Sequence, residues 1–125
     1  MRLAKAPVKG FFRTLGYYPV TIKGLRFKAD PFHIGFWREV NRRTWEPQTF
    51  DILDEFLDSA STFVDVGAWI GPTVLYGARK ASKVFCFEPD TLAYQYLLYN
   101  LQLNRMSNVM PFHLALTEKT GFRRM

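Results

Sequence analysis

Three short apolar runs, separated by segments with helical character, constrain the fold of this chain more than any other feature. Residues 62–66 form the first run and precede a glycine-containing turn and a helix. Residues 83–88 form the second run and precede another helix, which ends near Leu103, and residues 108–114 resemble a third strand. Runs that are apolar at nearly every position suit parallel strands covered on both faces. The pattern predicts an α/β fold, a Rossmann-like doubly wound parallel sheet.

The residues before the first run are predicted to form an extension. Residues 1–19 look irregular, and residues 20–27 alternate apolar and polar side chains around Lys23-Gly24, which predicts a small β-hairpin. Residues 29–45 are interpreted as connecting structure. From Glu46 a helix is expected, with Pro47 in its first turn and one buried face made by Phe50, Leu53, Phe56 and Leu57.

The charge is unevenly distributed along the 125 residues. The net charge is +6, but residues 1–43 contain ten Lys and Arg against two acidic residues, a net of +8. Such asymmetry can mark an arm that contacts nucleic acid or a membrane surface. Here the basic residues stand singly among Gly, Pro and aromatic residues, with no helix expected to present them as a stripe. We therefore favour a solvated basic face over a nucleic-acid or membrane contact.

Two further features narrow the class of protein. No run approaches the ~18 apolar residues of a membrane-spanning helix, and no long apolar stretch follows the basic start at residues 1–5, so we expect a cytoplasmic chain. Cys86 is the single cysteine, which excludes an intramolecular disulfide. Its place in an apolar run favours a packing role over a catalytic one.

The turn after the first strand carries the most chemical information. Asp65 lies near the end of the strand, and Gly67 and Gly71 are the second and sixth residues after it. Gly67 allows a sharp turn and lets a ligand approach the bare backbone, and Gly71 is interpreted in the same way where the loop enters the helix. The first N–H groups of that helix, near Thr73, are free to receive a ligand carboxylate.

Glu88 supplies the second signal. It ends the second strand, 21 residues after Gly67. In doubly wound folds an acid at about this distance accepts hydrogen bonds from ribose hydroxyls. The loop has neither the G-x-G-x-x-G register of nicotinamide sites nor a phosphate loop. Asp65 would repel a pyrophosphate and attract an ammonium or sulfonium group, so the residues favour S-adenosyl-L-methionine over NAD.

Residues 64–73, together with Phe87-Glu88-Pro89-Asp90 and Asn100-Leu101, resemble the FkbM family of class I S-adenosylmethionine-dependent methyltransferases. Trp45-Glu46-Pro47 is similar to the segment before that family's first strand, and the resemblance covers roughly residues 20–121. The charge and the hairpin pattern predict a basic N-terminal extension over residues 1–45, and the resemblance implies that residues 46–125 are the N-terminal half of the methyltransferase domain, truncated after about the third strand. By the same resemblance the methionine part of the cofactor borders Asp65, Gly67 and Ala68, the ribose binds Glu88, and the adenine side borders Pro89 and Asp90.

Other residues of the region are weaker candidates. Trp69 departs from the family pattern, and its indole is expected to point out of the loop, over the cofactor or substrate. His113 lies where this fold approaches adenine, although a lone histidine is more often a packing residue. His33 has no partner at ligand spacing, so we infer no metal site. The candidate cofactor-binding residues are Asp65, Gly67, Ala68, Trp69, Gly71, Thr73, Glu88, Pro89, Asp90 and His113.

The resemblance implies O-methylation of a hydroxyl on a small-molecule, sugar or polyketide-like acceptor. No residue is assigned as the general base, and later strands of the domain are expected to carry the acceptor site. The expected partners are therefore the acceptor and the remaining half of the domain, and residues 1–125 alone are expected to be a poor enzyme. Two alternatives stay open: a non-catalytic Rossmann-like module with a basic N-terminal arm, and an NAD-dependent oxidoreductase, which the loop register disfavours.

Overall fold

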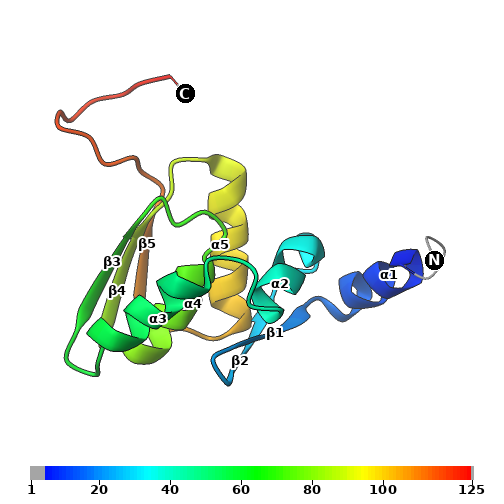
Figure 1. The fold of residues 1–125 in the computed structure, drawn as a ribbon. Helices are drawn as coiled ribbons and strands as arrows, with labels where there is room; N and C mark the ends of the chain where they lie inside the picture. The colour runs from blue at the N-terminus through cyan, green and yellow to red at the C-terminus, as the bar shows by residue number, and fades with distance from the viewer. Residues whose placement is uncertain (1–4, 125) are drawn as a thin grey trace.

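A computed structural model describes residues 5–124 (Figure 1). Its elements alternate in the predicted way from residue 47 onward, after a hairpin flanked by two helices. In chain order they are α1 (Lys5–Leu15), β1 (Tyr18–Ile22), β2 (Leu25–Ala29), α2 (Ile34–Asn41), α3 (Pro47–Phe56), β3 (Thr62–Val66), α4 (Pro72–Lys80), β4 (Lys83–Phe87), α5 (Thr91–Leu103) and β5 (Val109–Phe112).

The sheet confirms the α/β prediction. Its three strands are parallel in the order β3-β4-β5, with Val64 opposite Phe85 and Val84 opposite Val109. Helices α4 and α5 return the chain from the end of one strand to the start of the next and lie against the sheet (Figure 1). Val84 and Cys86 are fully buried. Burial raises the pKa of the Cys86 thiol to about 12, which agrees with a packing role for this cysteine.

The prediction that the sheet is covered on both faces is wrong for the described residues. Val64 and Val66 of β3 are 52% and 61% exposed, and Met110 and Phe112 of β5 are exposed as well. Alternate residues of a strand point to opposite faces, so these side chains share the face opposite Val84 and Cys86. Residues 5–124 place no helix on that second face, and its apolar residues stay open.

Two of the segments that were interpreted as irregular are partly helical. Within residues 1–19 the structure has α1, and within residues 29–45 it has α2. The buried residues of α2 are Ile34, Trp37 and Val40, whose three-residue spacing makes one apolar helix face. Gly35 and the clustered aromatic residues obscured this periodicity in the sequence. Pro7 and Gly10, which are poor helix formers, had the same effect for α1.

The hairpin and the helix that begins at Pro47, α3, agree with the sequence pattern. β1 and β2 pair antiparallel around Lys23-Gly24, both of which have positive φ. α3 has Pro47 in its first turn and buries Phe50 and Leu53. Phe56, however, was placed on the same buried face and is 71% exposed. Phe56 is the last residue of α3 and points away from the core, whereas Leu57, which follows it, is half-buried against the core.

The extension and the sheet share one hydrophobic core. Val20 and Phe27 of the hairpin and Trp37 of α2 belong to the same buried cluster as Val74 of α4 and Leu97 of α5. The boundary at residue 45 stays a prediction, but the residues on its two sides pack together. No helix among the described residues is long and apolar enough to cross a membrane.

Candidate functional site

The candidate residues meet at the carboxyl ends of β3 and β4. The chain leaves β3 through Gly67 and Ala68, whose N–H groups both donate to the carbonyl oxygen of Phe87, at 2.8 and 2.9 Å. These bonds fasten the loop to the last residue of β4. Because Glu88 follows Phe87 directly, the parallel strands bring Asp65 and Glu88 to the same edge of the sheet.

Gly67 has the conformation and the open surroundings that the sequence predicted. Its φ is +78°, in the left-handed region that favours glycine. A Cβ placed on Gly67 would meet no atom within 4 Å. The backbone at this position is therefore accessible, and a ligand could lie directly against it.

Gly71 has a reason to be glycine beyond the one expected from the sequence. It is buried, precedes α4 with a φ of +96°, and a Cβ there would lie 2.7 Å from Cδ1 of Leu97. The missing side chain makes room for α5. The close approach of a ligand to the Gly71 backbone stays a prediction, and the structure adds helix packing as a second reason for glycine at this position.

Trp69 turns toward the N-terminal extension. Its φ is +52°, and its ring is 39% exposed and packs edge-on against Phe36 of α2, with ring centroids 4.6 Å apart. A second edge-on contact, at 5.9 Å, is with His33. The indole thus points out of the loop as expected, but it lies against side chains of the extension.

Glu88 is a buried carboxylate, with only 7% of its surface exposed. Its Oε2 accepts a hydrogen bond from the Trp69 N–H at 2.6 Å, and its Oε1 accepts one from the Asp90 N–H at 2.8 Å. Asp90 in turn caps α5 by accepting from the Ala93 N–H at 2.8 Å. The carboxylate therefore holds two loops together, and each of its oxygens has a further lone pair for a ligand.

Asp65 lies near Glu88 in a partly buried position and accepts a hydrogen bond from the Thr73 hydroxyl. Burial raises the pKa of the Asp65 carboxyl, the Thr73 hydrogen bond opposes this rise, and the negative charge of Glu88 adds to it. Two interacting carboxylates thus lie at the edge of the sheet where the loop with the open Gly67 backbone begins. A ligand with a positively charged group would relieve the repulsion between them.

His113 and Pro89 lie together at the other side of β4. The His113 ring stacks on Tyr94, with centroids 4.8 Å apart, and its Nε2 is 3.0 Å from the carbonyl oxygen of Pro89. A pocket of about 420 Å³ is lined by these two residues, Thr91 and the segment that follows β5. This is the side at which an adenine ring was expected.

A buried polar network joins the segment after the hairpin to α5 and to the candidate cofactor loop, and the sequence pattern did not predict it. Asp30 has no exposed surface, and its carboxylate accepts from Nδ1 of His33 at 2.7 Å and from Nε1 of Trp37 at 3.0 Å. Asn100, also fully buried, accepts from the Asp30 N–H at 2.7 Å and donates to the carbonyl oxygen of Ile70 at 2.8 Å. His33 therefore does have a carboxylate partner, contrary to expectation. The only sequence signal was Asn100, which belonged to the family-like motif.

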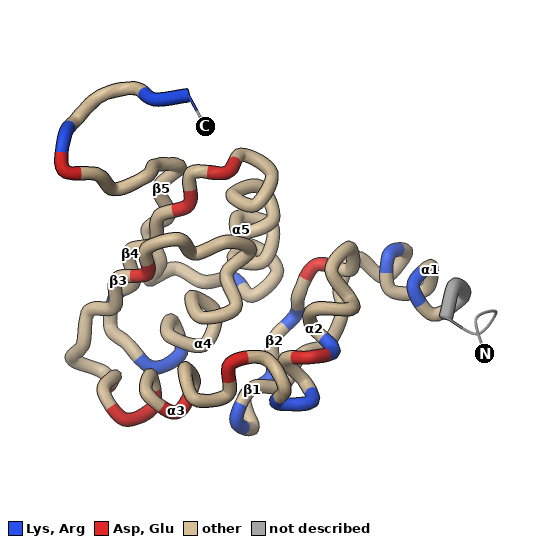
Figure 2. The backbone as a smooth tube through the Cα atoms, turned by 45° about the horizontal axis from the view of Figure 1, so that its top comes forward, with Lys and Arg blue, Asp and Glu red and all other residues tan. Residues whose placement is uncertain are grey.

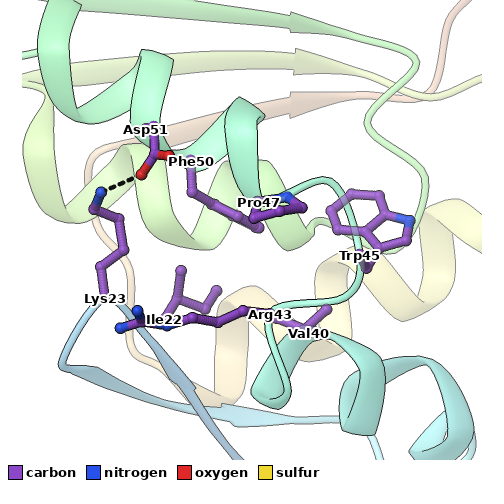
Figure 3. A pocket seen from close by; sticks show the side chains of 8 residues that line it. All are labelled: Ile22, Lys23, Val40, Arg43, Trp45, Pro47, Phe50 and Asp51. Atoms are coloured by element: carbon purple, nitrogen blue, oxygen red, sulfur yellow. Dashed lines mark hydrogen bonds and ion pairs between the residues drawn. The ribbon is translucent and has the colours of Figure 1, made fainter.

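A second pocket, of about 350 Å³, lies between the hairpin, α2 and α3 (Figure 3). Trp45 and Phe50 form part of its apolar wall, and the ion pair between Lys23 and Asp51 closes one end. Trp45 also packs on Phe36, with ring centroids 5.0 Å apart. Within residues 5–124, no group of three or more His, Cys, Asp or Glu side chains is arranged to hold a metal ion.

Comparisons with known proteins identify the fold. No protein-family model matches the sequence, and no curated protein matches it. Among solved structures, TYW2 from M. jannaschii in complex with AdoMet is similar, with a TM-score of 0.53 and 25% identity over 80% of this chain and 43% of that chain. The tRNA m1G37 methyltransferase of M. jannaschii has a TM-score of 0.55 and 18% identity over 78% and 29%. An rRNA methylase from Streptococcus thermophilus has a TM-score of 0.52 and 24% identity over 54% and 41%.

These likenesses show that the chain has the Rossmann-like fold found in methyltransferases. It spans between 29% and 43% of the length of the three solved chains.

Proposed function

We propose that the protein binds S-adenosyl-L-methionine at the carboxyl ends of β3 and β4 and transfers its methyl group. The observation that carries the proposal is the accessible backbone of Gly67, in the loop that follows β3, together with two carboxylates, Asp65 and Glu88, close enough to interact at the same edge of the sheet. That donor set fits a cationic ligand and disfavours a pyrophosphate. The complex of the similar M. jannaschii TYW2 with AdoMet supports the same cofactor.

Each residue of the site has a role in this proposal. Asp65, Gly67 and Ala68 border the methionine part, and Glu88 uses its remaining lone pairs to accept hydrogen bonds from the ribose hydroxyls. Pro89, Asp90 and His113 border the adenine. Trp69 and Thr73 shape the loop, the first through its contacts with the extension and the second through its hydrogen bond to Asp65.

When bound, S-adenosyl-L-methionine supplies a methyl carbon that its sulfonium group makes electrophilic. The protein's share of the chemistry is to position the acceptor oxygen in line with the departing sulfur and to provide a proton acceptor. No residue among those described is assigned as that base. We place it in the part of the domain that the family resemblance locates after β5.

For the acceptor, the FkbM resemblance favours a hydroxyl of a small molecule, such as a sugar or a polyketide-like product. RNA is the second candidate class, and two observations favour it. The first 43 residues have a net charge of +8, and two of the similar solved chains are an rRNA methylase and a tRNA methyltransferase. Transfer of a radioactive methyl group to sugar acceptors and to total RNA, assayed in parallel, separates the two classes.

The cofactor proposal is tested by thermal unfolding with S-adenosylhomocysteine, S-adenosylmethionine and NAD in parallel. A ligand that binds only the folded state stabilises it by about 2.7 kcal/mol at a concentration of 100 times its Kd. We expect the first two ligands to raise Tm and NAD to leave it unchanged. Stabilisation by NAD alone would identify an oxidoreductase, and the absence of any shift would favour a non-catalytic module.

A further inference from the structure

A shallow groove lies at the opposite end of the molecule from the candidate cofactor site. It has a volume of about 520 Å³, and β2, the end of α4 and the end of α5 form its walls. Four basic residues line it: Arg26, Lys28, Arg79 and Arg105. None of the described residues that line it is acidic. These cations come from three segments that are far apart in the sequence, so only the tertiary structure brings them together.

The four cations have no carboxylate partner among the residues that the structure describes. Packing holds two of them in place. The Arg79 guanidinium lies 4.9 Å from the centre of the Phe27 ring and donates to the carbonyl oxygen of Arg26 at 3.1 Å, and the Lys28 ammonium lies 4.7 Å from the centre of the Tyr17 ring. By contrast, Lys23 and Lys80 on the neighbouring surface are both paired with acids of α3.

Unpaired like charges around one groove repel one another, and a polyanion removes that repulsion while gaining entropy from the release of its counterions. The groove also lacks what a membrane-binding surface requires. None of the exposed large apolar residues, such as Phe11 or Phe32, lines it. We propose that this groove binds the sugar-phosphate backbone of a nucleic-acid strand.

The groove is a binding site in its own right and does not require methyl transfer. It lies at the end of α5, whereas Asp90 and Glu88 lie at the helix's beginning, and 13 residues at about 1.5 Å each separate the two sites by about 20 Å. A strand of about six nucleotides, with a rise of about 3.4 Å each, spans that distance. The groove therefore anchors a nucleic acid about 20 Å from the candidate cofactor site, where methyl transfer would take place. Figure 2 shows the basic segments of the hairpin that forms one of its walls.

The test is fluorescence polarisation of a labelled 12-nucleotide RNA, and of the DNA of the same sequence, over a series of salt concentrations. Four phosphate contacts give a slope of about −3 for the logarithm of affinity against the logarithm of salt concentration on a single strand. The groove variant combines Arg26→Gln, Lys28→Gln and Arg105→Gln. Arg79 is left in place because its packing on Phe27 contributes to folding. The control variant combines Lys9→Gln, Arg38→Gln and Arg42→Gln. It also removes three positive charges, from residues 1–43 but outside the groove.

We expect the groove variant to lose at least tenfold in affinity at low salt and to have a slope reduced to about −1, with the control close to the parent protein. Both variants should keep the Tm shift with S-adenosylhomocysteine, so that failure of the groove and failure of the cofactor site are distinguished. Equal losses in the two variants would show a diffuse charge effect and overturn the proposal. No binding of either oligonucleotide by the parent, or binding of phosphatidylserine vesicles instead, would overturn it as well.

Discussion

Glu88 has a structural task beside the binding role proposed for it. The structure buries this carboxylate and gives it two backbone N–H partners, so its loss should change stability as well as binding. Burial at the end of a strand depends on the loop that folds over it, here residues 67–71. A single residue therefore connects the stability of the site with its capacity to bind.

The first prediction concerns Glu88→Ala. The variant should lose about 1–3 kcal/mol of unfolding free energy, because the N–H groups of Trp69 and Asp90 lose their acceptor, and about 1.5–3 kcal/mol of S-adenosylhomocysteine affinity. Urea denaturation and calorimetry measure the two effects. Glu55→Ala, on the exposed surface of α3, is the control and should change neither. Unaltered ligand affinity in Glu88→Ala would remove this residue from the site.

The second prediction concerns the pH dependence of stability at Asp65. Burial raises the pKa of this carboxyl in the folded state above the ordinary value of 3.8, so the unfolded chain releases its proton first. The contribution of Asp65 to the free energy of unfolding therefore falls as the pH rises through the window above 3.8. We expect Asp65→Asn to be more stable than the parent at neutral pH and to bind S-adenosylhomocysteine more weakly.

Urea denaturation over a pH series measures this effect. Asp58→Asn is the control of opposite sign, because the hydrogen bond from the Ala60 N–H lowers the pKa of Asp58, and the variant should lose stability at neutral pH. If Asp65→Asn is the less stable protein at neutral pH, the hydrogen bond with Thr73 outweighs the cost of burial.

At the scale of elements, the loop between β3 and α4 uses its two glycines differently. Both have positive φ, but only Gly67 has open space above its Cα, whereas Gly71 lies against Leu97 of α5. The loop therefore has one accessible position, which we assign to the ligand, and one position on which helix packing depends.

The third prediction compares alanine at these two glycines. Gly67→Ala should cost about 1–2 kcal/mol of unfolding free energy for the left-handed backbone alone, and it should abolish the Tm shift with S-adenosylhomocysteine. Gly71→Ala adds a steric clash with Leu97, and we expect it to cost about 1–3 kcal/mol more. Urea denaturation ranks the two variants. Normal ligand binding by a folded Gly67→Ala protein would show that the ligand does not lie over this backbone.

At the scale of the whole molecule, one buried network unites the extension with the sheet domain. Asn100 of α5 contacts Asp30, which follows the hairpin, and Ile70, which belongs to the candidate cofactor loop. A side chain at the centre of the molecule thereby sets the position of the loop relative to α2. The aromatic contacts of Trp69 with His33 and Phe36 also join this loop to the extension.

The fourth prediction is that Asn100→Leu destabilises the protein by about 3 kcal/mol or more, since the buried Asp30 N–H and the Ile70 carbonyl lose their partner and the Asp30 carboxylate loses a donor. We also expect weaker binding of S-adenosylhomocysteine, because the loop loses its support. Gln102→Leu, on the exposed side of the same helix, should change stability by less than about 0.5 kcal/mol. Chemical denaturation of the two variants makes the comparison, and equal stabilities would contradict the structural role of Asn100.

The sequence alone was enough to predict the order of strands and helices from residue 47 onward, the hairpin around Lys23-Gly24, the turn at Gly67 and the approach of Glu88 to that turn. These features depend on residues close in the chain, or on the rule that parallel strands joined by a helix align their carboxyl ends. Local spacing and turn chemistry therefore contain the information needed to infer them.

Only the tertiary structure decided which of these residues are buried and what they contact. The burial of Glu88, the clash that excludes a side chain at Gly71, the pairing of Asp30 with Asn100 and the four cations of the groove all depend on contacts between distant segments. Asp30 and Asn100 are 70 residues apart in the chain. A sequence pattern records the period of a helix or strand, but it does not record which other element that helix or strand packs against, and burial depends on that packing.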